Sequence, residues 1–133
     1  MFPPQHLTVI LNPAASGGRG AKIQPRLEEE LSSRQIPFTL HRTDGPGHAQ
    51  LLASQATSKG VDLIMVVGGD GTIHEVANGI LMEGSDPTPL AVIPVGTGND
   101  FFRMLGGSKE PGSALDGLLA GTVRHFDVGR VRY

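Results

Sequence analysis

The chain has 133 residues, of which 38% are hydrophobic and 18% are charged, and this balance suits one folded domain and excludes a disordered tail. The formal net charge is −2 and the basic residues form no run, so nothing favours a nucleic-acid surface. The absence of cysteine excludes disulfides and fits a reducing compartment, so we expect a cytoplasmic protein. Residues 1–6 lack the apolar segment of a signal peptide, and no apolar run approaches the ~20 residues that cross a bilayer.

The first half of the chain predicts two strand–helix units. An apolar run predicts a strand at residues 7–11, and a glycine-rich loop at residues 16–20 leads into an amphipathic helix that reaches about residue 34. Alternating apolar residues predict a second strand at residues 36–42. A second amphipathic helix follows, with Gly60 expected at its carboxyl-terminal end.

The second half of the chain continues the same alternation. The run at residues 63–67 is typical of a buried central strand, and it leads through Gly68–Thr72 into an apolar helical pattern that ends near Leu81. A fourth strand at residues 90–94 ends at a second glycine-rich loop. Two short helical stretches, at residues 101–105 and around 114–119, and a strand at residues 122–128 complete the prediction.

Alternating strands and helices predict a three-layer α/β sandwich, with a mostly parallel sheet, right-handed crossovers and helices on both faces. We expect residues 1–133 to form a single domain of this kind. In such sheets, ligands bind at the carboxyl ends of the strands. Because each conspicuous glycine loop follows a strand, we expect these loops to open close together on one edge of the sheet.

Glycine loops that lie between a strand and a helix are suited to phosphate. Glycine lets the backbone approach the anion, and the free N–H groups of the helix terminus add donors and partial positive charge. Gly68–Thr72 has this layout, and the loops at residues 96–99 and 16–20 resemble it. Asp70 would hold Mg²⁺, directly or through water, or would orient or deprotonate an attacking hydroxyl. The alternative is that Asp70 only accepts hydrogen bonds within its loop.

Several polar residues in these loops have a simpler structural interpretation. Thr72 and Glu75 have the spacing of a capping box, so we expect them to begin a helix. Asp127 either faces the ligand edge or only ends the last strand. His48 is expected to help begin a helix, and His74 to lie on an exposed helix face. The five histidines are scattered without the spacing of a zinc site. Strict P-loop, Rossmann and protein-kinase motifs are absent, so the residues alone indicate a phosphate-binding α/β domain with Mg²⁺.

Five ordered elements resemble the diacylglycerol kinase catalytic domain family, whose members include bacterial lipid kinases and sphingosine kinases. They are Asn12-Pro13 with Ser16-Gly17, Thr43 with His48-Ala49, Gly68–Thr72 with Glu75 and Asn78-Gly79, Pro94–Phe101 with Arg103, and Asp127–Gly129. The resemblance covers nearly the whole chain and implies the fold of the amino-terminal nucleotide-binding domain. It also implies an enzyme of phospholipid metabolism that transfers the γ-phosphate of ATP to a lipid hydroxyl such as that of diacylglycerol.

The resemblance assigns roles by position. Asp70 would join the network of Mg²⁺ and phosphate, with the metal held through water, and Asp127 would support it as a second catalytic residue. The residues that would contact ATP are Asn12, Pro13, Ala14, Ala15, Ser16, Thr43, Gly69, Asp70, Gly71, Thr72, Ile73, His74, Glu75 and Thr97.

Family members carry a second, β-rich domain after this one, expected to supply the general base and the lipid cavity. The chain stops at Tyr133, so we expect a form that lacks this domain and transfers phosphate poorly or not at all. The lipid would be met at a membrane surface, and apolar surface left uncovered would favour self-association. Two alternatives stay open, an NAD kinase-like phosphotransferase and a non-catalytic nucleotide-binding module. A Rossmann dinucleotide domain is disfavoured by its missing third glycine.

Overall fold

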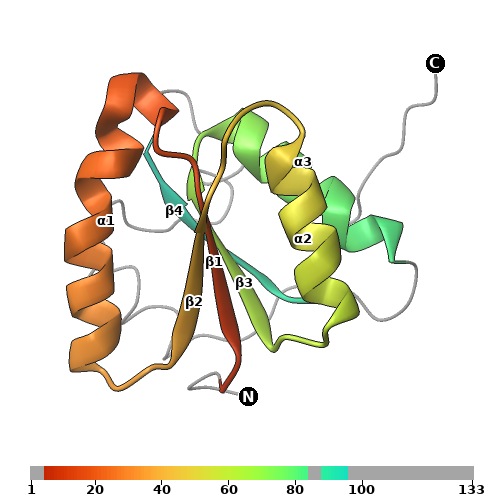
Figure 1. The fold of residues 1–133 in the computed structure, drawn as a ribbon, viewed down its shortest axis with the longest axis horizontal. Helices are drawn as coiled ribbons and strands as arrows, with labels where there is room; N and C mark the ends of the chain where they lie inside the picture. Colours follow the sequence, from red (N-terminus) through yellow and green to blue (C-terminus); the bar gives the residue numbers. More distant parts are fainter. Residues whose placement is uncertain (1–4, 84–87, 96–133) are drawn as a thin grey trace.

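The computed structural model describes residues 5–83 and 88–95, which form a parallel sheet with helices on both faces, as expected (Figure 1). The expected elements beyond residue 95 lie outside the described residues. The elements, in chain order, are β1 (Leu7–Leu11), α1 (Ala15–Ser33), β2 (Phe38–Arg42), α2 (His48–Ser58), β3 (Leu63–Gly68), α3 (Asp70–Met82) and β4 (Leu90–Pro94).

The strands lie in the order β2-β1-β3-β4, and every neighbouring pair is parallel. The chain therefore moves in one direction from β1 to β2 and in the opposite direction from β2 through β3 to β4. Crossovers of a single hand must then place α1 on one face of the sheet and α2 and α3 on the other. Figure 1 shows this arrangement, with α1 on one side of the strands and the other two helices together on the opposite side.

Two apolar clusters, one on each face, hold the helices to the sheet. Residues of β1 alternate between them: Val9 and Leu11 pack with Leu27 and Leu31 of α1, whereas Ile10 packs with residues of α2 and α3. Every residue of β1 and β3 is buried, as the apolar runs predict for strands covered on both faces. Burial on both faces fixes the register, because a slip by one residue would exchange the two sets of side chains.

Helices α2 and α3 pack against each other at small residues. A Cβ atom built on Gly79 would lie 2.3 Å from the Gln50 carbonyl oxygen and 2.8 Å from the Ala53 Cβ, so glycine is required for this close approach. Helix α2 ends as expected at Gly60, which has a left-handed φ of 78°. The N–H groups of Gly60 and Val61 donate to Thr57 and Ala56, the pattern of a Schellman motif.

The second strand is shorter than its alternating pattern indicates. It begins at Phe38 rather than at the expected Ile36. Ile36 instead closes α1, because its N–H donates to the Leu31 carbonyl while Gln35 adopts a left-handed φ of 57°. Pro37 then follows without a backbone N–H to donate. Apolar alternation could not separate the buried residue that ends a helix from the first residue of the strand.

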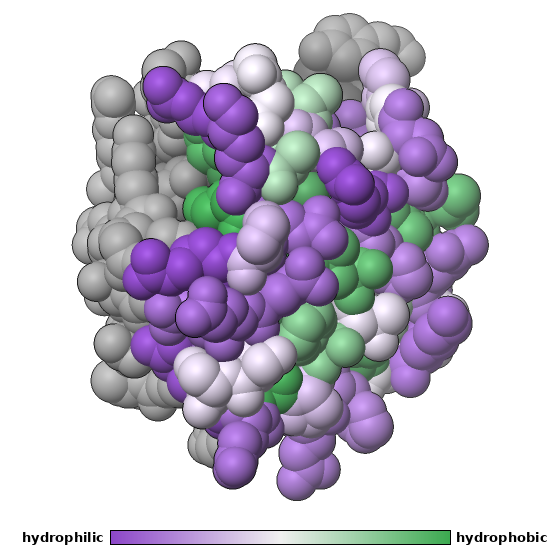
Figure 2. Space-filling model, turned by 60° about the vertical axis from the view of Figure 1, so that its left-hand side comes forward, coloured by the Kyte–Doolittle hydropathy of each residue, from purple (hydrophilic) through white to green (hydrophobic). Residues whose placement is uncertain are grey.

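The outward side of α1 is polar. Figure 2 brings this side of the molecule forward and shows mainly hydrophilic residues with smaller apolar areas between them. Glu30 accepts hydrogen bonds from Arg34 and, at 2.9 Å, from Arg26, and these bonds, led by that from Arg34, hold the pKa of its carboxyl below the ordinary value. Within residues 5–83 and 88–95, no helix combines the length and the apolarity that crossing a membrane requires.

Asp62 ties the segment before β1 to the turn before β3. Its Oδ2 accepts hydrogen bonds from the N–H groups of Gln5 at 2.9 Å and His6 at 3.1 Å, and these bonds lower the pKa of its carboxyl. The pKa of an aspartate in the unfolded chain is about 3.9. Because the pKa of Asp62 is lower in the folded protein, the ionised carboxylate contributes stability at pH values above about 3.9, and this contribution is lost as the pH falls through the folded-state pKa.

We therefore expect Asp62→Asn to reduce the free energy of unfolding at neutral pH, with a difference from the unchanged protein that shrinks below about pH 4. Urea unfolding near neutral pH and near pH 3 measures this difference. A difference of the same size at both values would mean that the charge of Asp62 contributes nothing.

Candidate functional site

The strands end together at one edge of the sheet, and backbone hydrogen bonds continue the pairing just beyond them. The Asn12 N–H donates to the Val67 carbonyl at 2.9 Å, and the Thr43 N–H donates to the Leu11 carbonyl at 2.9 Å. Val95 N–H, past the end of β4, donates to the Gly68 carbonyl at 3.2 Å. The loops after β1, β2 and β3 that were predicted to carry ligand-binding residues therefore open on the same edge.

The strand order places a topological switch point between β1 and β3. The connection that leaves β1 crosses to β2 over one face, while the connection that leaves β3 crosses to β4 over the other. Loops diverge at such a point and leave room above the strand ends, where ligands bind in open parallel sheets. Asn12 follows β1 and Gly69 follows β3, so these two predicted residues flank the switch point.

The two loops at the switch point are joined by the side chain of Asn12. Its Nδ2 donates to the Thr72 Oγ1 at 3.1 Å, and its Oδ1 accepts from the Ala14 N–H at 3.1 Å. Thr72 is buried, with 7% of its surface exposed. The Asn12 amide therefore fixes its own loop through Oδ1 and holds that loop against the first turn of α3 through Nδ2.

The prediction that Thr72 and Glu75 form a capping box at the start of α3 is wrong. The N-cap residue is Gly69 rather than Thr72, and the structure records no side-chain cap at this end of the helix. The helix begins at once after the strand, so Thr72 already lies in its first turn, where its hydroxyl accepts from Asn12. Glu75 lies one turn further and accepts a hydrogen bond from the Gly47 N–H at 3.0 Å.

The amino terminus of α3 lies at the strand ends, with the backbone N–H groups of its first turn. The Ile73 N–H donates to the Gly69 carbonyl and makes the first hydrogen bond of the helix ladder. The first N–H groups of an α-helix lie outside its own hydrogen-bond ladder, and together with the helix dipole they favour an anion. Gly68 allows the tight strand–helix junction, because a Cβ atom there would lie 2.9 Å from the Thr72 side chain.

The other predicted residues of this loop differ in exposure. Asp70, Gly71 and His74 are exposed, whereas Ile73 packs in the apolar cluster on the face of α2 and α3. Ile73 can therefore reach a ligand only through its backbone. The expected exposed position of His74 is confirmed, and its Nε2 lies 3.1 Å from the Asn78 Nδ2.

The segment after Asn12-Pro13 begins α1 with an irregular turn. Ser16, Gly17 and Gly18 have positive φ values of 52°, 69° and 100°, so the regular helix starts only after them, as the predicted loop at residues 16–20 implies. A non-glycine residue such as Ser16 in this region carries backbone strain, and strained residues cluster at functional sites. Gly20 lies against this turn, and a Cβ atom there would be only 1.9 Å from the Asn12 carbonyl oxygen.

The loop after β2 is fixed at both ends. Thr43 is bonded to β1, and Gly47 to Glu75 of α3. His48 begins α2 as expected, and its Nδ1 accepts from the Asp44 N–H at 2.9 Å. Sequence reasoning placed Gly20 and Gly47 in loops that follow strands but gave neither residue a role of its own. Thr97 and Asp127 lie outside the described residues.

The donors at this edge suit Mg²⁺ only as a partner of phosphate. Across residues 5–83 and 88–95, no group of three His, Cys, Asp or Glu side chains could hold a metal ion alone. Mg²⁺ keeps most of its waters and is bound through one or two carboxylates together with substrate phosphates. Asp70, exposed in the first turn of α3, fits that arrangement.

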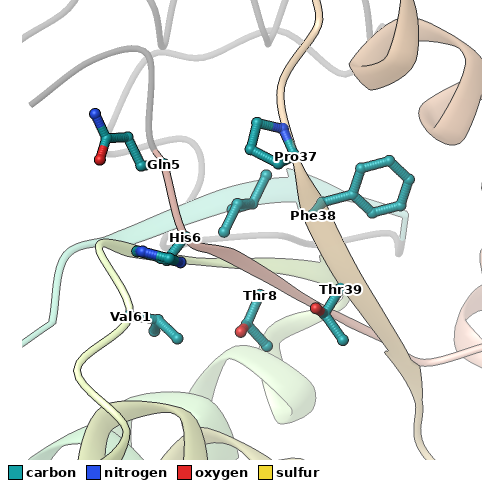
Figure 3. Close-up of a pocket in the computed structure, with 8 residues that line it drawn as sticks. Gln5, His6, Thr8, Pro37, Phe38, Thr39 and Val61 are labelled. Atoms are coloured by element: carbon teal, nitrogen blue, oxygen red, sulfur yellow. The ribbon is translucent and has the colours of Figure 1, made fainter.

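A separate cavity of about 210 Å³ lies at the opposite edge of the sheet (Figure 3). It is bordered by the first residues of β1 and β2, and Figure 3 shows Thr8 and Thr39 on neighbouring strands beside His6. These strand starts are removed from Asn12, Thr43 and Asp70 by the length of the sheet. The cavity therefore belongs to no part of the candidate site.

The fold and this edge define a doubly wound α/β domain with the amino terminus of α3 at its switch point. The sequence profile of the diacylglycerol kinase catalytic domain matches residues 6–131, so the chain belongs to that family. It is 37% identical over 124 residues to a diacylglycerol kinase of Bacillus subtilis (strain 168), which covers 92% of this chain and 41% of that protein. A diacylglycerol kinase of Mycobacterium tuberculosis is 33% identical over 128 residues, covering 95% of this chain and 40% of its own length.

Solved structures agree with this assignment. A crystal structure of a diacylglycerol kinase from Bacillus anthracis str. Sterne superimposes with a TM-score of 0.78 at 31% identity, covering 90% of this chain and 41% of that one. A second structure from the same organism gives a TM-score of 0.80 at 30% identity. The chain thus spans about two fifths of the length of the relatives that it matches.

Proposed function

We propose that this chain supplies the ATP-binding part of a lipid kinase, which transfers the γ-phosphate of ATP to a lipid hydroxyl such as that of diacylglycerol. The observation that carries the proposal is the hydrogen bond between Asn12 and Thr72 at the switch point, which holds the loop after β1 beside the first turn of α3. The names of the relatives support the phosphoryl transfer and the lipid acceptor.

In this proposal the residues at the edge act mainly by position and charge. The first-turn N–H groups of α3 would donate hydrogen bonds to the phosphate oxygens, and the strained turn at Ser16–Gly18 would add backbone donors beside them. Bound Mg²⁺ would neutralise charge on the phosphates, and Asp70 would hold it through water. Such fixed donors lower the barrier because they need no rearrangement as charge develops.

Because the relatives are more than twice as long as their matched part, we propose that acceptor binding and the general base depend on residues outside the matched region. The lipid would then be met at a membrane surface. The roles predicted for Thr97 and Asp127 belong to the same proposal. On this basis residues 1–133 bind nucleotide but transfer phosphate at least ~100-fold more slowly than a full-length relative, since the acceptor is not positioned.

Calorimetric titration of the chain with ATP tests the donor half of the proposal. We expect a dissociation constant below ~1 mM with Mg²⁺, and weaker binding in its absence. Binding indifferent to Mg²⁺ would instead support a passive nucleotide-binding module, and the absence of binding would contradict the proposal.

A chimera tests the lipid kinase assignment. In it, this chain replaces the matched 41% of the Bacillus subtilis diacylglycerol kinase. We expect ATP-dependent phosphorylation of diacylglycerol in mixed micelles. A folded chimera that binds Mg²⁺ and ATP yet phosphorylates no diacylglycerol would contradict the assignment.

A further inference from the structure

Glu75 connects the beginning of one helix to the body of another. Its Oε1 accepts a hydrogen bond of 3.0 Å from the N–H of Gly47, the N-cap residue of α2. Gly47 has a left-handed φ of 85° and has no side-chain cap of its own. The two residues are 28 positions apart, so the contact depends on the packing of α2 against α3.

The bond has the form of half a capping box, supplied by a different helix. In a capping box, the side chain three residues after the N-cap accepts from the N-cap N–H. In α2 that residue is Gln50, but its Nε2 lies 3.0 Å from the Met82 Sδ instead. Glu75 of α3, rather than Gln50 of α2, therefore accepts the hydrogen bond from the Gly47 N–H. A carboxylate beside a helix N-terminus is also favoured by the helix dipole.

This contact bears on the candidate site because it fixes one end of the loop that carries Thr43. The other end is fixed by the Thr43 N–H bond to Leu11 of β1. A second carboxylate aimed at a triphosphate would repel it unless a metal lay between them. The Glu75 carboxylate has instead a backbone donor within its own fold.

We propose that Glu75 is a positioning residue: it holds the loop of residues 43–47 at the nucleotide edge through the Gly47 N–H. The expected effect on ATP affinity rests on the proposed function, whereas the contact between Glu75 and Gly47 can be tested without any ligand.

The test compares Glu75→Ala, Glu75→Gln and the control Glu83→Ala in the chain of residues 1–133. Glu83 also joins the two helices, through a 3.0 Å bond from the Ser54 hydroxyl, but at the far end of α3. Hydrogen exchange of the Gly47 amide is followed by NMR without ligand. Affinity for ATP with Mg²⁺ is measured by calorimetry.

We expect Glu75→Ala to speed Gly47 exchange and weaken ATP binding, each about tenfold, because a hydrogen bond to a charged acceptor is lost. Glu75→Gln should keep ATP affinity within about twofold, since its amide oxygen can still accept the bond. Glu83→Ala should change neither measurement.

Equal Gly47 exchange in all variants would overturn the inference. So would a loss of Mg²⁺-dependent affinity in Glu75→Gln as large as in Glu75→Ala, because the carboxylate would then be a direct ligand. If the unchanged chain binds no ATP, the proposed function fails, while faster exchange in Glu75→Ala would still support the role of Glu75 in holding the loop.

Discussion

Replacing Asp70 with asparagine is expected to weaken the binding of ATP in the presence of Mg²⁺ by at least ~10-fold, while binding of ATP without the metal becomes no weaker. Asp70 is exposed in the first turn of α3, beside the N–H groups that would receive the phosphates. Its charge attracts a metal ion but repels the bare nucleotide, so the two affinities should respond in opposite directions. Calorimetric titrations with Mg²⁺ and with a chelator measure both.

The variant should remain folded, because the change is isosteric and removes a charge near a helix N-terminus worth less than ~1 kcal/mol. The matched control is Asp62→Asn, which removes the same charge at the opposite edge of the sheet. We expect it to change the affinity for ATP and Mg²⁺ less than about twofold. Equal losses in both variants would show that overall charge, and not the position of Asp70, governs binding.

Replacing Gly20 with alanine is expected to lower the free energy of unfolding by about 3 kcal/mol. The added Cβ atom would lie 1.9 Å from the Asn12 carbonyl oxygen and 2.9 Å from its carbonyl carbon. Neither atom can move alone, because the Asn12 N–H is bonded to β3 and its side chain to Thr72. The start of α1 must therefore shift away from the strand ends, and nucleotide affinity should fall with stability.

Urea unfolding measures the loss of stability. Gly17→Asn serves as the control in the same turn, since a Cβ atom at Gly17 meets nothing within 4 Å and asparagine tolerates its φ of 69°. We expect this control to cost less than ~1 kcal/mol. A Gly20→Ala variant as stable as Gly17→Asn would mean that α1 does not depend on close contact with the loop after β1.

Much of the fold could be predicted from local patterns. Residues 7–11 and 90–94 form strands within the predicted limits. The first run is buried throughout because both faces of the central sheet are covered, whereas residues 90–92 of the edge strand β4 are only half-buried. Gly60 follows the end of α2 because glycine has no Cβ atom and therefore adopts a left-handed φ at little cost, whatever surrounds it. The common edge of the loops also followed from the sequence, since parallel strands joined by crossovers must end together.

The sequence by itself therefore determined the class of fold, the edge of the sheet at which the glycine-rich loops meet, and, through its ordered motifs, the family. Only the tertiary structure decided what Thr72 and Glu75 do. Their spacing predicted a helix cap, but Thr72 bonds to Asn12 across 60 residues and Glu75 to Gly47 across 28. A hydroxyl or a carboxylate forms a hydrogen bond with the donor or acceptor that lies within about 3 Å of it in the folded chain. Which group lies there depends on the order of the strands and the packing of the helices, and not on the spacing of residues along the sequence.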